Sequence, residues 1–122
     1  MKIIACENIA PPKGHYSLAV RQGDLIFLSG IIPEIEEGGA QAFEVQVRSV
    51  FTKCEAILTA SESDLQRVIS CTAYIVGIEN WELFNSVYAQ LMGAHRPVRS
   101  VVPVPALHHG SSVELQVIAS VL

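Results

Sequence analysis

Two segments of the chain carry apolar residues at helical spacing. Between residues 40 and 60 the apolar side chains recur every three or four positions, which places them along one stripe of a helix. A second stripe runs through residues 81–92, where Asn80 stands in front as a favourable N-cap residue. The two stripes consist of Phe43, Val47, Val50, Phe51, Cys54, Ile57 and Leu58 and of Trp81, Phe84, Val87, Tyr88 and Leu91. Each helix is therefore predicted to bury one face.

Five other segments are typical of strands, because they are rich in alternating or β-branched apolar residues. They are residues 16–21, 25–28, 68–76, 99–106 and 112–122. Gly23 lies in a turn that makes the first two a hairpin. Pro103 and Pro105 lie two apart in the fourth, so both remove backbone donors from the same side and favour an edge or bulged strand. The order β-β-α-β-α-β-β predicts an α+β two-layer sandwich, with both helices on one face of a single sheet.

The amino-acid composition predicts that part of the protein surface is apolar and takes part in association. Hydrophobic residues make up 50% of the 122 residues and charged residues 16%, below the usual level of about 25%. A single domain of this length has a small interior, so part of the apolar excess lies on its surface, where it usually marks association. The helices leave the second sheet face bare. We therefore expect another copy of the chain to cover it, in a closed homo-oligomer.

Net charge, apolar run length and cysteine spacing argue against several classes of partner and cofactor. The net charge is −4, and no basic run interleaved with aromatic residues occurs, so we expect no nucleic-acid partner. No apolar run approaches the ~20 residues of a membrane span, and the N-terminus does not resemble a signal peptide, so no membrane partner is expected. Cys6, Cys54 and Cys71 are widely spaced and are predicted to be buried free thiols in a reducing cytoplasm. No metal or cofactor is expected.

Arg99 is the main candidate for chemistry. Pro97 ends the second predicted helix, and Arg99 opens the apolar strand that follows. A guanidinium at the start of such a strand is costly to desolvate without a partner. The partner is either an internal carboxylate, for which Glu114 on the next predicted strand is the best candidate, or a carboxylate that arrives with a ligand. The residue itself does not decide between the two.

Two further motifs have open readings. Gly30, after the second strand, indicates either the strand's end or a place where another group approaches the backbone closely. His108 and His109 lie in a turn between strands, without other metal-binding residues at suitable spacing. They are predicted to be exposed surface residues.

Several short motifs together resemble the RidA/YjgF family of enamine/imine deaminases. They occur in the family's order and at its spacing, and they cover nearly the whole chain. They are Tyr16-Ser17, Phe27-Leu28-Ser29-Gly30 with Pro33, Phe84-Asn85-Ser86-Val87-Tyr88, Arg96-Pro97-Val98-Arg99-Ser100 and Val113-Glu114-Leu115. The resemblance implies a chorismate-mutase-like fold and a homotrimer whose sheets face a central barrel, with ligand clefts between subunits.

The resemblance also implies a reaction. It implies that Arg99 holds the carboxylate of a small 2-aminoacrylate-type enamino or imino acid, which is hydrolysed to a 2-keto acid and ammonia without a cofactor. Glu114 would activate water and move a proton, with the remaining motif residues lining the pocket: Tyr16, Ser29, Gly30, Asn85 and Val101. Many relatives carry Cys where Val101 stands, and Gln is frequent where Ile31 stands. These two departures keep open an alternative, a non-catalytic trimer that binds small carboxylates.

Overall fold

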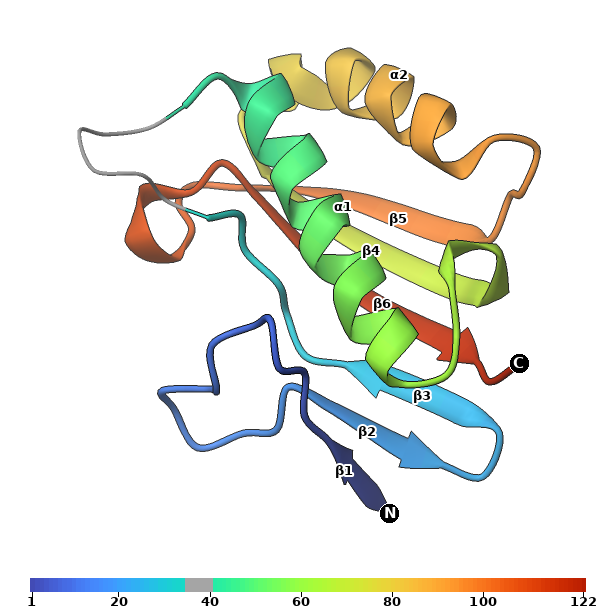
Figure 1. Cartoon of the computed structure of the whole chain (residues 1–122). Helices are drawn as coiled ribbons and strands as arrows, with labels where there is room; N and C mark the ends of the chain where they lie inside the picture. Colours follow the sequence, from blue (N-terminus) through green and yellow to red (C-terminus); the bar gives the residue numbers. More distant parts are fainter. Residues whose placement is uncertain (35–40) are drawn as a thin grey trace.

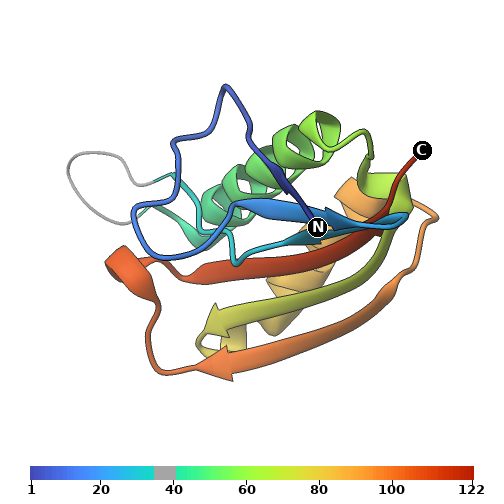
Figure 2. The same ribbon diagram turned by 90° about the horizontal axis from the view of Figure 1, so that it is seen from below.

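The computed structural model describes residues 1–34 and 41–122. They form one six-stranded sheet with two α-helices on one of its faces, as Figures 1 and 2 show from two directions. The strands are β1 (Lys2–Ile4), β2 (Ala19–Gln22), β3 (Leu25–Leu28), β4 (Val68–Val76), β5 (Val98–Val104) and β6 (Val113–Ser120). The helices are α1 (Phe43–Ala60) and α2 (Trp81–Met92), and three short 3₁₀ turns span Leu65–Arg67, Ile78–Asn80 and His108–Gly110. The predicted α+β two-layer architecture is confirmed.

The sheet order is β1-β2-β3-β6-β4-β5. Neighbouring strands are antiparallel except β4 and β5, which run parallel and are joined through α2. The prolines correctly indicated that β5 is an edge strand. An edge strand tolerates Pro103 because the missing donor can lie on the side without a neighbour.

Sequence periodicity located most elements closely, but β2 begins at Ala19 and not at residue 16, and β5 ends at Val104 and not at residue 106. The bounds of β3, β4 and α2 agree with the prediction, whereas residue 40, the predicted start of the first helix, lies outside the described residues. β1 was not predicted, since three residues are too short to display an alternation. Asn80 does not cap α2 through its side chain, because its Nδ2 atom donates instead to the Val76 carbonyl, 3.0 Å away.

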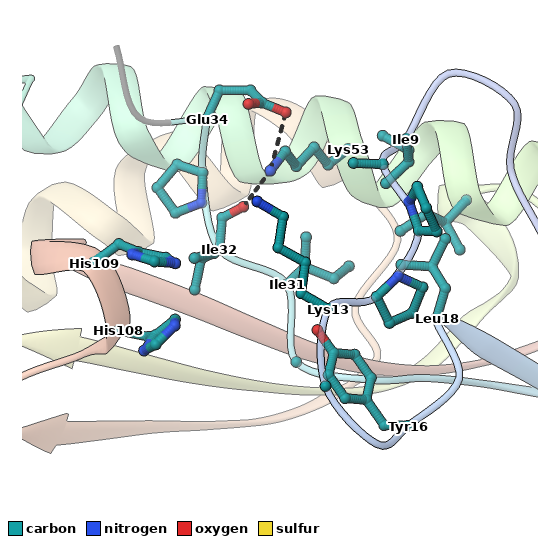
Figure 3. A pocket seen from close by; sticks show the side chains of 17 residues that line it. Ile9, Lys13, Tyr16, Leu18, Ile31, Ile32, Glu34, Lys53, His108 and His109 are labelled. Carbon is teal, nitrogen blue, oxygen red and sulfur yellow. Dashed lines mark hydrogen bonds and ion pairs between the residues drawn. The ribbon is translucent and has the colours of Figure 1, made fainter. Parts of the chain in front are cut away.

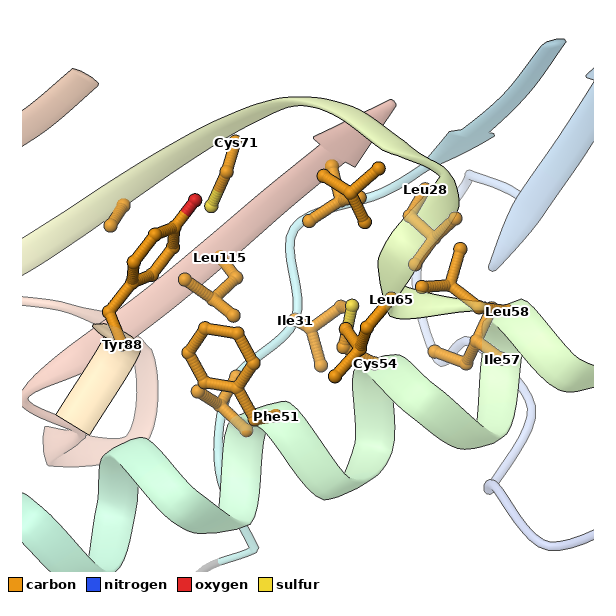
Figure 4. Packing of buried hydrophobic residues seen from close by; sticks show 14 of the residues in the cluster. Leu28, Ile31, Phe51, Cys54, Ile57, Leu58, Leu65, Cys71, Tyr88 and Leu115 are labelled. Carbon is orange, nitrogen blue, oxygen red and sulfur yellow. The ribbon is translucent and has the colours of Figure 1, made fainter. Parts of the chain in front are cut away.

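The core lies between the helices and the sheet. The two helical stripes pack on buried side chains of the central strands, among them Ile26, Leu28, Cys71, Ile75, Leu115 and Val117. Figure 4 shows Phe51, Cys54 and Ile57 of α1 against this layer. Two predictions need correction: Trp81 is 37% exposed, and Cys6, unlike Cys54 and Cys71, is only partly buried. No helix in the described part of the chain is long and apolar enough to cross a membrane.

The second sheet face is not covered by any described element, and one row across it is largely apolar, whereas the next row, Gln116, Thr72 and Ser100, is polar. A single row of side chains crosses it from one edge to the other, in register: Ile3, Val20, Phe27, Ile118, Ser70 and Val98. Five of these six side chains are apolar, and Ile3 and Val98 are more than 60% exposed. Exposed apolar rows of this kind usually mark association, so the association expected from the composition stays a prediction. We call this surface, formed by that row, the open face.

Candidate functional site

Arg99 lies beneath α2 at the edge of the sheet. It is in register with Cys71, which is buried on the helix-covered face, so its side chain points to the same side. Its Nη1 atom donates to Oδ1 of Asn85 on α2 at 2.9 Å. The guanidinium carbon lies 4.7 Å from the ring centroid of Tyr88, 5.6 Å from Trp81 and 5.9 Å from Phe84. One hydrogen bond and three aromatic rings therefore hold the guanidinium in place.

The structure contradicts an ion pair between Arg99 and Glu114. β4 lies between β5 and β6, so the two residues are not on neighbouring strands. Arg99 is in register with Cys71 and Glu114 with Tyr74, three residues further along β4, which puts the two side chains on opposite faces. No carboxylate of the described residues lies within 4.0 Å of Arg99. The Glu114 partner expected for this guanidinium is therefore wrong within one protomer.

A cavity of about 570 Å³ opens beside Arg99, between α2 and the start of β5. Asn85, Tyr88 and Arg99 form one part of its wall, and His95 and Arg96 from the connecting turn form another. Nε2 of His95 lies 2.7 Å from the Val68 carbonyl oxygen, which fixes that turn to β4. The cavity gives a small ligand access to the guanidinium from the edge of the sheet.

Glu114 belongs to a second group of predicted site residues. A Cβ atom built on Gly30 would lie only 2.7 Å from Oε2 of Glu114, so the carboxylate rests against the glycine backbone. Of the two readings of Gly30, close approach is thus the one confirmed. Partial burial raises the pKa of Glu114 above its ordinary value, and the nearby His108 offsets part of that rise.

Tyr16 and Gly30 border a larger cavity of about 840 Å³, which Figure 3 shows together with Lys53, His108 and His109. The Tyr16 ring is 56% exposed. The side chain of Ser29 is held in place by a hydrogen bond, because its hydroxyl donates to the Ser17 carbonyl oxygen at 2.6 Å. Both histidines are exposed, as predicted, and no group of three metal-binding side chains occurs among residues 1–34 and 41–122.

The predicted site residues therefore fall into two groups within one protomer. Arg99, Asn85 and the β5 residue Val101 lie at the edge of the sheet near α2. Tyr16, Ser29, Gly30 and Glu114 lie around the ends of β2, β3 and β6. We call these the arginine group and the glutamate group. The sheet separates Arg99 from Glu114, so one protomer does not bring both groups to the same ligand.

Comparison with known proteins places this geometry in a family. The sequence profile of the family described as Endoribonuclease L-PSP matches residues 7–121. The chain belongs to the RidA/YjgF family. Among its relatives are Protein HMF1 of Saccharomyces cerevisiae, 34% identical over 96% of this chain and 92% of that protein, and the chloroplastic Reactive Intermediate Deaminase A of Arabidopsis thaliana, 30% identical over 98% and 65%. The crystal structure of E. coli TdcF with bound serine has a TM-score of 0.89, 28% identity and coverage of 98% of each chain.

The structure adds residues to which the RidA/YjgF resemblance assigned no role. Trp81, Phe84 and Tyr88 were predicted as ordinary core residues of a helical stripe, yet they surround the guanidinium. Their spacing of three and four residues was visible in the sequence, but nothing local indicated that Arg99 lies beneath them. The chloroplastic relative also means that the expected cytoplasmic location of this RidA/YjgF protein stays a prediction.

Proposed function

We propose that this protein hydrolyses small 2-imino and 2-enamino acids to 2-keto acids and ammonia. The observation that carries the proposal is Arg99: a fixed, partly buried guanidinium beside a cavity, with no described carboxylate within 4.0 Å. A planar guanidinium binds a carboxylate through two parallel hydrogen bonds. The relative named Reactive Intermediate Deaminase A and the serine bound to TdcF support a small amino-acid-like ligand.

The role of Arg99 in this reaction is to orient the substrate. An imine beside a carboxylate is already reactive toward water, so catalysis consists mainly of holding the substrate, a water molecule and a proton acceptor in line. The hydrogen bond from Arg99 to Asn85 uses one nitrogen and leaves other donors for the carboxylate. The aromatic rings keep these donors in one orientation.

We assign proton transfer to Glu114. Water adds to the imine carbon, the C=N pair moves to nitrogen, and the carboxylate of Glu114 takes the proton that the water loses. Glu114 then returns this proton to the nitrogen of the carbinolamine. Glu114 next takes the hydroxyl proton of the neutral carbinolamine and passes it to the nitrogen, the C–N bond breaks with release of ammonia, and the C=O bond of the 2-keto acid forms. An enamino acid first takes a proton on carbon to give the same imine.

We further propose that neighbouring protomers supply the two groups, in a homotrimer. Arg99 and Glu114 lie on opposite faces of one sheet, and the apolar open face needs a cover. The backbone of Val101 supports a cleft at the β5 edge. Backbone groups of residues two apart point the same way, so the Val101 carbonyl lies on the same side as the nitrogen of Pro103; because that nitrogen has no hydrogen to donate, we expect this to be the free side of the edge strand.

Phe27→Asp should disrupt this assembly. Phe27 is 37% exposed in the middle of the open face, where a buried, unpaired carboxylate would strongly oppose association. We expect a trimer for the parent protein and a folded monomer for the variant in analytical ultracentrifugation. Ile78→Asp is the control, because Ile78 is 61% exposed but lies outside the open face. A monomeric parent protein would contradict the proposal.

The reaction itself is tested by a coupled assay. An amino-acid lyase generates 2-aminoacrylate from serine, and we expect the purified protein to accelerate pyruvate release over the spontaneous rate. Arg67→Ala serves as a control because Arg67 is exposed and lines neither cavity described above. Carboxylate binding without any acceleration would favour the non-catalytic alternative. RNA incubated in parallel is expected to remain intact, since the net charge of −4 opposes binding to phosphates.

The pH dependence tests the role of Glu114. The base must be ionised, and burial raises its pKa above 4.5, so the rate should fall as the pH decreases through this raised value. Glu114→Gln should lower the rate about a hundredfold and remove this acidic limb. His108→Ala should shift the limb to higher pH, because the imidazolium of His108 lowers the pKa of Glu114.

The same raised pKa has a consequence for stability that serves as a check. Below pH 4.5 Glu114 is neutral in both the folded and the unfolded protein, and its full contribution to stability is present. As the pH rises through the raised folded-state pKa, the partly buried carboxyl ionises and the free energy of unfolding falls. Glu114→Gln should therefore keep or increase the free energy of unfolding at pH 7. An acidic limb that stays in Glu114→Gln, or moves to lower pH in His108→Ala, would show that Glu114 is not the base.

A further inference from the structure

The cavity beside Arg99 carries a second positive charge. Arg96, in the turn between α2 and β5, lines the same 570 Å³ cavity as Arg99, and no Asp or Glu does. Among the described residues neither guanidinium has a carboxylate within 4.0 Å. This is a local concentration of positive charge in a protein whose net charge is −4.

We propose that this cavity selects imino acids with a second carboxylate in the side chain, and that Arg96 binds this distal carboxylate. The substrate class is therefore the four- and five-carbon dicarboxylic 2-imino acids. The inference rests on the proposed function, since it assumes that Arg99 holds the carboxylate next to the imine. It adds a specificity-determining residue and a preferred charge of the substrate.

The turn that carries Arg96 is held on both sides. His95 Nε2 donates to the Val68 carbonyl at 2.7 Å, because a carbonyl oxygen only accepts. Pro97, the next residue, has a fixed φ, and Gly93 ends α2 with φ at 64°. The backbone of Arg96 is thus anchored, while its exposed side chain has no hydrogen-bond partner among residues 1–34 and 41–122. An anchored backbone places the charge at the rim of the cavity.

Electrostatics then separates the two substrate classes. A monocarboxylic imino acid neutralises Arg99 and leaves the charge of Arg96 unpaired at the cavity. A dicarboxylic imino acid places its second carboxylate beside the guanidinium of Arg96. It therefore gains a second attractive interaction in the same cavity. A monoanion gains no such second contact.

The size and lining of the cavity agree with the longer substrate. A volume of about 570 Å³ lies well within the ~300–1,000 Å³ typical of small-molecule sites. A three-carbon imino acid held at Arg99 leaves much of it empty. Ala89 and Met92 line the cavity and offer apolar contact to the methylene groups between the two carboxylates. The lining thus combines two positive groups with apolar side chains.

A matched pair of substrates tests this. An amino-acid oxidase generates 2-iminoglutarate from glutamate and 2-iminopentanoate from norvaline, two five-carbon compounds in which a carboxylate replaces a methyl group. We expect kcat/KM to be about tenfold higher for 2-iminoglutarate, as for one charge-assisted contact. Arg96→Ala should remove this preference by lowering kcat/KM for 2-iminoglutarate toward that for 2-iminopentanoate, and Arg96→Glu should reverse it. Arg67→Glu, the same charge change outside the cavity, should keep it.

Calorimetry with 2-oxoglutarate and 2-oxopentanoate separates this inference from the proposed function. Turnover of both imines with equal efficiency, unchanged in Arg96→Ala, overturns the inference and leaves the proposed function intact. No turnover of either imine, but tighter binding of 2-oxoglutarate that depends on Arg96, overturns the proposed function and supports the dicarboxylate class. Equal loss of preference in Arg67→Glu would also overturn the inference, because net charge and not Arg96 would then set the selectivity.

Discussion

Replacing Arg99 by alanine is expected to lower kcat/KM for a small 2-imino acid about a thousandfold. The guanidinium is predicted to make two charge-assisted hydrogen bonds to the substrate carboxylate, and each such bond contributes about 1.5–3 kcal/mol. Because every 1.4 kcal/mol is about a factor of ten, two bonds correspond to roughly two to four orders of magnitude. The lyase-coupled assay measures this loss, and calorimetry with a 2-keto acid should show a parallel loss of binding.

Conservative variants show whether Arg99 acts through its geometry. Arg99→Lys keeps the charge but not the planar pair of donors, so it should recover only a small part of the activity. Asn85→Ala removes the one described hydrogen bond to the guanidinium and should lower activity less than Arg99→Ala does. Circular dichroism checks that each variant is folded. Full activity of a folded Arg99→Ala variant would refute the assignment of the substrate carboxylate to this residue.

The largest expected effect on stability comes from Phe84→Ala. Phe84 is fully buried on α2, packs on Tyr88 with ring centroids 5.7 Å apart, and lies 5.9 Å from the guanidinium of Arg99. Removing a buried phenylalanine side chain leaves a cavity and typically costs about 3–5 kcal/mol. That is a large part of the ~5–15 kcal/mol by which a domain is stable. Urea unfolding at a fixed protomer concentration measures the loss.

Leu83→Ala is the matched control, because Leu83 is the neighbouring residue of α2 and is 41% exposed. Its free energy of unfolding should change by about 1 kcal/mol or less. Phe84→Leu should fall between the two, since it keeps much of the buried volume. Equal losses in Leu83→Ala and Phe84→Ala would mean that helix propensity, and not the core beneath α2, determines the effect.

The aromatic residues of α2 that face the sheet contribute to both the fold and the candidate site. The stripe that buries α2 is the one whose rings hold Arg99, so the same residues stabilise the helix and orient the guanidinium. Of the three aromatic residues around Arg99, Trp81 differs most from a core residue. It is 37% exposed, less buried than a core residue of its stripe should be, and it lies 5.6 Å from Arg99. Its exposure fits a position at the edge of the core, against the guanidinium of Arg99.

Local patterns determined the elements of this protein. The helical spacing of Phe84, Val87 and Tyr88, the alternation in β4 and β6, and the prolines at positions 103 and 105 all act within a few residues of chain, so the sequence alone predicted helices, strands and an edge position. The short sequence motifs around Arg99 and Glu114 identified the family and the residues of the arginine group and the glutamate group. The strand β1 was not predicted, because its three residues are too few to show an alternation.

Only the tertiary structure decided which of these residues meet. The sequence made Glu114 the best internal partner for Arg99, but the sheet inserts β4 between their strands and puts them on opposite faces. Strand order and side depend on contacts between segments far apart in the chain, and no local pattern records them. For the same reason the aromatic surroundings of Arg99, and the cavity it shares with Arg96, became visible only once the chain was folded.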